Sequence, residues 1–145
     1  CDRKTDEGRR DSETFLAYML PAGVPFYARY CSEDLAIGIY TMWRDFDARG
    51  ADFHPYWREL PGFRPQCDPA QVQVSAYTHP DRLLVVAGNT SDQEQRVTIE
   101  VDGQTLGLGT DATVRRTFPE RDATFAGGRL EMTVPAFSFA LVWLG

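Results

Sequence analysis

Alternation of apolar and polar residues through the second half of the chain constrains the fold most. The pattern runs through residues 71–76 and returns at 96–101 and 130–134. Successive side chains of a strand point to opposite faces, so each segment predicts a strand with one buried and one solvated face. From about Gln71 to Gly145 the chain is therefore predicted to be built from strands.

Two further segments complete this set of strands. Residues 83–87 are apolar throughout and predict a central strand, and the last strand carries a row of large side chains predicted to face inward: Phe137, Phe139, Leu141 and Trp143. Turn residues separate the strands at 79–81, 89–92, 102–103 and 127–128. Short connections require antiparallel neighbours, and about seven or eight strands bury all their inward faces best as a two-layer sandwich.

The first fifty residues follow a different pattern. Residues 2–13 are nearly all charged and predict a surface loop, after which Ser12 is expected to cap a short helix that Pro21 ends. The apolar stretch Val24–Tyr30 predicts a buried strand. A second helix is predicted from Ser32 to Gly50, with an apolar stripe on one side. Helix, strand and helix together are typical of an α/β unit.

Residues 51–70 read as a packed connector. Aromatic residues at 53–57 are followed by Pro61, Gly62, Pro65 and Pro69, which exclude a regular helix. Flexible linkers are polar and rich in Gly and Ser, so this composition favours rigid packing between two units.

Composition excludes several classes of function. The net charge of −6 is shared equally between residues 1–70 and 71–145, and the basic residues are outnumbered by carboxylates in both parts. Nucleic-acid binding, which depends on a Lys and Arg surface, is therefore not expected. No apolar run is long enough to span a membrane. The sequence leaves the compartment open.

Cysteine and histidine spacing indicates neither a metal site nor a disulfide framework. Cys1, Cys31 and Cys67 are far apart and have no paired spacing, and the two His do not complete a zinc site. No metal and no cofactor is implied. A single bridge between Cys31 and Cys67 stays open as an alternative.

The order of these elements resembles the C-terminal end of barrel glycoside hydrolases. The residues that carry the resemblance are those at 20–25, the helix around Trp43, the aromatic run at 53–58, and the strand segments 72–77, 83–89 and 135–144. They look like the tail of glycosidase-like proteins related to family 123, in which a (β/α)8 barrel is followed by a β-sandwich. The motifs are packing patterns, and none is a catalytic signature.

The resemblance implies a fold and a division of labour. The expected fold is an α+β fragment: residues 1–50 form the helix-strand-helix end of a (β/α)8 barrel, residues 51–70 connect, and residues 71–145 form the antiparallel β-sandwich. The chain begins at Cys1 without an initiator Met, so the barrel and its acidic catalytic pair are expected upstream. The upstream barrel is then the main partner, and no catalytic residue is assigned to this chain.

Candidate site residues follow from geometry. Barrel active sites lie at the C-terminal ends of the strands, so Arg29 and Tyr30 are candidates for the rim of a sugar site. Tyr56, Trp57 and Tyr77 are candidates for stacking on sugar rings, although Tyr56 and Trp57 are also expected to pack between the two units. Asp45 and Asp47 are two positions apart on a helix and diverge by about 200°, so they cannot face one substrate.

Three functions remain in view. The preferred one is an accessory region that supports a carbohydrate-active enzyme without catalysing the reaction. The alternative is a stand-alone module that binds carbohydrate or protein, and a third is a secreted structural domain.

Overall fold

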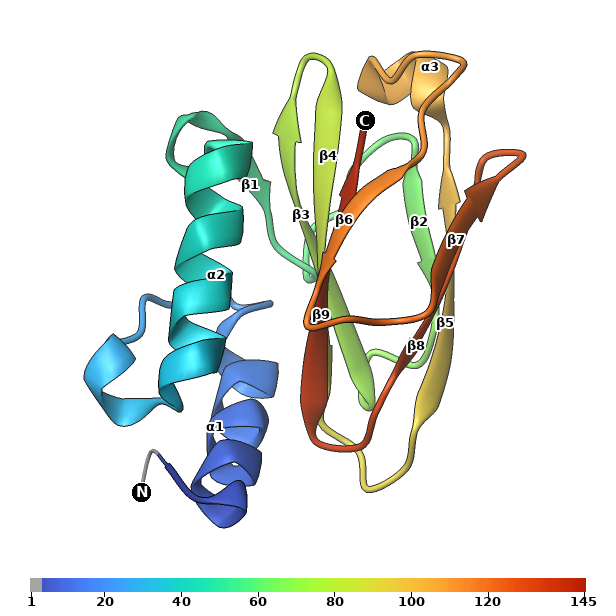
Figure 1. Cartoon of the computed structure of the whole chain (residues 1–145). Coiled ribbons are helices and arrows are strands. Elements are labelled where there is room, and N and C mark those ends of the chain that lie inside the picture. The colour runs from blue at the N-terminus through green and yellow to red at the C-terminus, as the bar shows by residue number, and fades with distance from the viewer. Residues whose placement is uncertain (1–3) are drawn as a thin grey trace.

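The computed structural model describes residues 4–145 and has three layers (Figure 1). Two helices, α1 (Asp6–Met19) and α2 (Glu33–Phe46), cover one face of a five-stranded sheet, and a four-stranded sheet covers the other. The short turns η1 (Ala28–Tyr30) and η2 (Ala48–Gly50) flank α2. Residues 1–3, including Cys1 and the start of the predicted charged loop, lie outside the described residues.

All strand pairs are antiparallel, which confirms the predicted sandwich. The five-stranded sheet has the order β1-β3-β4-β9-β6. Its strands are β1 (Asp52–His54), β3 (Val72–His79), β4 (Arg82–Asn89), β9 (Ser138–Leu144) and β6 (Val114–Phe118). The four-stranded sheet has the order β2-β5-β8-β7, with β2 (Phe63–Gln66), β5 (Gln95–Val101), β8 (Arg129–Val134) and β7 (Ala123–Ala126).

Strand β4 is central, as its unbroken apolar sequence predicts. It pairs with β3 on one side and β9 on the other, and every residue from Leu83 to Asn89 is buried. The reason is that both faces of the five-stranded sheet are covered. Leu83, Val85 and Ala87 enter the core between the sheets. Leu84 and Val86 pack against the helices.

The inward face predicted for the last strand belongs to this second core. Phe139 and Leu141 are fully buried against the helix layer, and Trp143 packs edge-on against Phe46 of α2 at 5.4 Å between ring centroids. The smaller residues between them, Ala140 and Val142, fill the core between the sheets. Phe139, Leu141 and Trp143 form the predicted apolar face, but they contact helices and not the opposite sheet. The prediction was wrong for Phe137, which precedes β9, takes a left-handed conformation (φ 49°) and is 40% exposed.

Helix α1 begins earlier than predicted. The expected surface loop is helical from Asp6, because the Thr5 hydroxyl accepts a hydrogen bond from the Gly8 amide (3.0 Å) and Asp6 and Glu7 lie at the positive end of the helix dipole. Ser12 is not a cap. It is buried inside the helix, donates to the Gly8 carbonyl and accepts from the Ser32 amide at 2.8 Å, which links α1 to the start of α2.

The predicted strand Val24–Tyr30 does not exist. The segment pairs with no strand and ends in the turn η1, and only Phe26 is buried within it. Pro25 removes a backbone donor, and Tyr27 and Tyr30 point to the surface, so the aromatic run is not a buried strand. Phe26 instead stacks on Tyr40 of α2 at 5.3 Å.

Helix α2 starts after Ser32, as predicted, but ends at Phe46 and not at Gly50. Asp47 takes the left-handed conformation (φ 61°) and its carboxylate accepts from the Gly50 amide, so a residue other than glycine terminates the helix. Within the connector at 51–70, the strands β1 and β2 each form an edge of one sheet. The connector therefore joins the two sheets of the sandwich.

Candidate functional site

A groove lies where the connector crosses from one sheet to the other. Because β1 and β2 are edge strands of different sheets, the loop between them spans the open side of the sandwich. The groove has a volume of about 590 Å³. It is lined by His54, Pro55, Tyr56, Trp57, Arg58, Glu59, Leu60, Pro61, Gly62, Phe63, Arg64, Pro65, Val74, Glu100 and Asp102. This volume is within the range of small-molecule sites.

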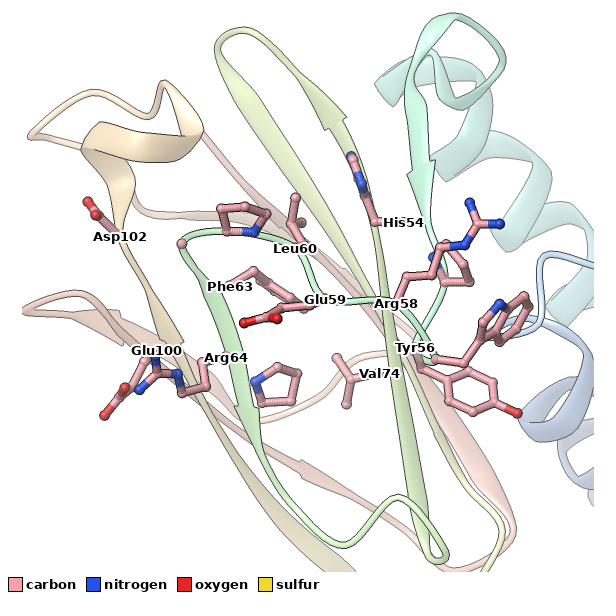
Figure 2. A pocket seen from close by; sticks show the side chains of 15 residues that line it. His54, Tyr56, Arg58, Glu59, Leu60, Phe63, Arg64, Val74, Glu100 and Asp102 are labelled. Atoms are coloured by element: carbon pink, nitrogen blue, oxygen red, sulfur yellow. The ribbon is translucent and has the colours of Figure 1, made fainter.

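The groove has an aromatic end and a charged end. Figure 2 shows Tyr56 at one end and Glu100 with Asp102 at the other, with Leu60 and Phe63 between them. Phe63 and Val74 are buried and belong to the core between the sheets, so the middle of the groove rests on fixed side chains. The result is an apolar floor with polar groups at its margin.

Tyr56 and Trp57 form the aromatic end. Their rings meet edge-on at 5.0 Å, and they remain 43% and 58% exposed. The Tyr56 amide donates to the hydroxyl of buried Ser75 at 2.9 Å, and that hydroxyl donates to the Pro21 carbonyl at 2.5 Å. The backbone of the aromatic pair is therefore held to β3 and to the end of α1, while both rings stay at the surface.

Four charged side chains border the groove without partners among residues 4–145: Arg58, Glu59, Arg64 and Glu100. All four are exposed, and no hydrogen bond or ion pair joins their side chains to another described residue. Arg64 and Glu100 are direct neighbours across the β2-β5 pair. Donors and acceptors thus lie together along one margin.

Asp102 differs from the other acidic residues because it caps the short helix α3 (Gly103–Leu106). Its carboxylate accepts from the Gln104 and Thr105 amides and from the Thr105 hydroxyl at 2.7 Å. These bonds, the Thr105 hydroxyl first, hold the pKa of Asp102 below its usual value. Asp102 is thus an ionised acceptor. A general acid of glycoside hydrolysis needs the opposite shift.

The acidic pair on α2 is occupied elsewhere. Asp45 accepts from Arg116 at 2.9 Å and from Arg44 at 3.0 Å, and these bonds lower the pKa of Asp45. Asp47 ends the helix. Neither residue lines the groove.

The candidate residues from the sequence are not all brought together. Tyr56 and Trp57 line the groove, whereas Arg29 and Tyr30 lie exposed on η1. Tyr77 faces the helix side of the five-stranded sheet, contacts Phe53 at 4.8 Å, and lines a separate apolar hollow of about 540 Å³. Burial raises the pKa of Tyr77. Its part in stacking on a sugar ring stays a prediction.

Sequence reasoning missed the charged margin of the groove. Arg64 and Glu100 are 36 positions apart, and only the pairing of β2 with β5 brings them opposite each other. The sequence shows only that both are polar residues in short strand segments. Every solvated strand face has such residues, so this signal is not specific.

The remaining chemistry is sparse. Within residues 4–145, no cluster of three or more His, Cys, Asp or Glu side chains could hold a metal ion. Cys67 is a free thiol, so the Cys31–Cys67 bridge left open from the sequence is not formed; burial raises the pKa of Cys67. No helix in the described part of the chain is long and apolar enough to cross a membrane.

Comparison with known proteins gives one family match. A family model described as "Glycoside hydrolase 123, C-terminal domain" matches residues 36–120. No curated protein matches the chain.

Comparison with solved structures finds similarity to three enzymes. An α-amylase from Anoxybacillus is 16% identical with a TM-score of 0.53, over 77% of this chain and 22% of that chain. A family 30 subfamily 8 xylanase from Clostridium acetobutylicum is 19% identical with a TM-score of 0.37, over 59% of this chain and 24% of that one. A family 30 endoxylanase from Clostridium papyrosolvens is 18% identical with a TM-score of 0.37, over 58% of this chain and 24% of that chain. The chain thus spans less than a quarter of these enzymes' lengths.

Proposed function

The chain belongs to the glycoside hydrolase 123 C-terminal domain family, and from this premise we propose that it is the accessory region of a carbohydrate-active enzyme. In this proposal the catalytic acids belong to an upstream domain, which on the family resemblance is a (β/α)8 barrel. Residues 1–50 contact that barrel, residues 51–70 connect, and residues 71–145 form the body of the sandwich. The region supports the enzyme and does not catalyse the reaction.

The observation that carries the proposal is the apolar surface of the helix layer. Ten large apolar side chains are exposed among the described residues, and seven of them come from positions 15–40. We call these seven the helix-layer face: Phe15, Tyr18, Val24, Tyr27, Tyr30, Ile37 and Tyr40. Exposed apolar side chains concentrated in one region are typical of a contact surface. The short turn η1 lies on the side of the helices away from the sheets (Figure 1).

Charges within this chain also agree with a supporting role. Asp45 of α2 is the ion-pair partner of Arg116, and Asp47 ends the helix. In the groove, Asp102 is engaged as a cap with a lowered pKa. A hydrolase needs one carboxyl group with a raised pKa facing a second carboxylate. We therefore place both acids upstream.

Arg29 and Tyr30 have a specific part in the proposal. Both are exposed on η1, next to Tyr27, whose ring contacts that of Tyr30 edge-on at 6.4 Å. At the border with the barrel, Arg29 would donate hydrogen bonds to the substrate and Tyr30 would stack on a sugar ring.

The proposal is tested with one substitution in two contexts. Ile37→Glu changes a side chain that is 58% exposed in this chain, so the 145-residue protein should keep its melting temperature to within about 2 °C. In the complete protein the same change places a charge in the contact and should lower the melting temperature by about 5 °C or more.

Ala126→Glu, at an exposed position on β7, is the matched control and should be silent in both contexts. Equal effects of Ile37→Glu in both contexts would exclude the helix-layer face as the contact. The 145-residue chain should also show no hydrolysis of a panel of aryl glycosides that the complete protein cleaves.

A second candidate function is a carbohydrate-binding module. The observation that favours it is the exposed Tyr56 and Trp57 pair in the groove. This activity is compatible with support of a barrel, because the helix-layer face and the groove share no residue.

A further inference from the structure

We propose that the groove between β1 and β2 binds a neutral oligosaccharide, with one pyranose ring stacked on Trp57 or Tyr56. The C–H groups on one face of a pyranose form an apolar surface, and the face of an aromatic ring offers a matching surface with negative charge density. Trp57 and Tyr56 are the large apolar side chains of the sandwich that combine high exposure with a position in a hollow.

The aromatic pair is positioned before any ligand arrives. The Tyr56 amide is tied to Ser75, and the connector backbone makes a turn in which the Arg58 amide donates to the Pro55 carbonyl at 3.0 Å. The Phe63 amide donates to the Leu60 carbonyl at 3.1 Å and closes the other end of the loop. A preorganised loop loses little conformational freedom on binding. The contacts of the rings therefore contribute to the binding free energy without a large entropic cost for ordering the backbone.

Polar groups of the groove indicate an uncharged, polyhydroxylated ligand. Two guanidinium groups, from Arg58 and Arg64, and three carboxylates, from Glu59, Glu100 and Asp102, line one hollow. Each sugar hydroxyl both donates and accepts, so it can use either kind of partner. An anionic ligand would meet more carboxylates than guanidinium groups, and a cationic one would meet Arg58 beside the rings. A neutral sugar fits the mixture best.

Shape supports an oligosaccharide over a single sugar. The groove extends from the aromatic pair to the end of β5, and its floor is made of the buried side chains Phe63 and Val74 (Figure 2). Stacking at one end and hydrogen bonding at the other require a ligand that spans both. This inference rests on the second candidate function, a carbohydrate-binding module, and names its site and its ligand class. It does not depend on structural support of a barrel, because the helix-layer face and the groove share no residue.

Titration of the 145-residue protein with neutral oligosaccharides tests the proposal. The panel contains linear oligomers of glucose, xylose, mannose, galactose and N-acetylhexosamines, followed by calorimetry and by Trp fluorescence. At least one oligomer should bind saturably, and Trp57→Phe should abolish the fluorescence change that reports it. Trp57→Ala should weaken binding by about tenfold or more, as expected for an aromatic residue central to a contact. Tyr56→Ala should weaken it less.

Phe137→Ala is the control, because Phe137 is an exposed aromatic residue outside both the groove and the helix-layer face, and it should leave binding unchanged. Binding should also be insensitive to salt, since the ligand carries no charge. The circular dichroism spectrum and melting temperature of each variant confirm that it is folded. Tyr56→Ala serves as a second test if Trp57→Ala is misfolded.

Three results would overturn the proposal. The first is the absence of saturable binding across the panel. The second is binding that Trp57→Ala and Tyr56→Ala leave unchanged. The third is loss of binding in the complete protein while the 145-residue chain still binds, because that would mean the upstream domain covers the groove. These outcomes are independent of Ile37→Glu, so the failure of one role is distinguishable from the failure of the other.

Discussion

Asn89 is a fully buried amide that joins three segments of the sandwich. Its Nδ2 donates to the carbonyls of Gln93 (2.8 Å), Val134 (3.0 Å) and Pro135 (3.1 Å). Its Oδ1 accepts from the amide and the hydroxyl of Ser91. The side chain therefore ties the end of β4 to the turn that follows it and to the end of β8 in the other sheet.

Removal of this side chain should be costly. Asn89→Ala leaves buried carbonyls without donors and opens a small cavity, so we expect a loss of about 3 kcal/mol in the free energy of unfolding. Urea denaturation measures the loss. Thr90→Ala, which removes one exposed hydrogen bond to the Gln71 carbonyl, is the control and should cost below about 1 kcal/mol. A similar loss for both variants would show that Asn89 is an ordinary turn residue.

Asp45 offers a prediction with a defined pH dependence. The hydrogen bond from Arg116 of β6, followed by that from Arg44, holds the pKa of Asp45 below its usual value of 3.8. The folded state thus binds this proton less readily than the unfolded state. The stabilisation is present above the usual pKa and is lost as pH falls through the lower folded value.

Asp45→Asn should accordingly lower the melting temperature near neutral pH, and the difference from the unmodified protein should shrink in acid. Melting curves from about pH 7 to about pH 2.5 measure it. Asp52→Asn, at an exposed position that forms no ion pair with another residue of 4–145, is the control. A difference that stays constant with pH would contradict the ion pair between α2 and β6.

Residue type alone does not reveal these roles. The run Asn89-Thr90-Ser91-Asp92 predicts a turn, and the chain does turn after Asn89, but Asn89 itself is the last residue of β4. Nothing in the run indicates that its side chain also reaches β8. Tyr56 and Trp57 were recognisable as binding candidates because aromatic rings stack on sugars. The sequence also predicts that they pack between the two units, but the structure leaves both rings exposed. Arg64 and Glu100 were not, because their proximity depends on strand register.

Helix α1 lies unusually close to strand β4, and Gly88 makes that possible. A Cβ atom at Gly88 would lie 2.0 Å from the Ala17 carbonyl oxygen and 2.7 Å from Cγ of Pro21. Ala17 and neighbouring Leu16 are fully buried in this contact. The helix rests on backbone, with no side chain between.

Gly88→Ala should therefore displace α1 from the sheet. We expect a loss of about 2 to 3 kcal/mol in the free energy of unfolding, which urea denaturation measures, because overpacking shifts the backbone of both elements. Gly103→Ala is the matched control: its Cβ would meet only Leu108 Cβ at an ordinary 3.4 Å, so the loss should be below about 0.5 kcal/mol. If the two substitutions cost the same, the close approach of α1 is not needed for stability.

Elements with a sustained period were predictable, and short elements were not. β3, β4, β5 and β8 follow from alternation or from an unbroken apolar run. β1 and β2 escaped detection because they have three and four residues, and β2 contains Pro65, which a sheet tolerates at an edge. The segment Val24–Tyr30 was wrongly predicted as a strand because aromatic residues favour strands. In the structure, its rings pack on α2 or face outward.

The five-stranded sheet contributes to two cores, one on each face. The helices and both sheets are therefore expected to fold as one unit. One face contributes to the core between the sheets, and the other buries Leu84, Val86, Phe139 and Leu141 under α1 and α2. The expectation that each sheet has one solvated face is met by the four-stranded sheet only. Alternation within a strand indicates one covered face, but it does not tell whether a sheet or a helix covers it.

Residues 51–145 without the helix layer should not form a stable module. Truncation before Ala51 leaves both sheets intact but exposes the apolar outer face of β4 and β9, and exposed patches of this kind promote association. We expect the fragment to aggregate or bind hydrophobic dye, whereas the 145-residue chain should be monomeric and unfold in one transition seen by circular dichroism and by Trp fluorescence.

The triple substitution Leu84→Thr, Val86→Thr and Leu141→Thr should make the fragment soluble, because it makes the outer face more polar. A soluble, monomeric fragment without these substitutions would mean that the helix layer is dispensable, and that the sandwich alone is the functional unit.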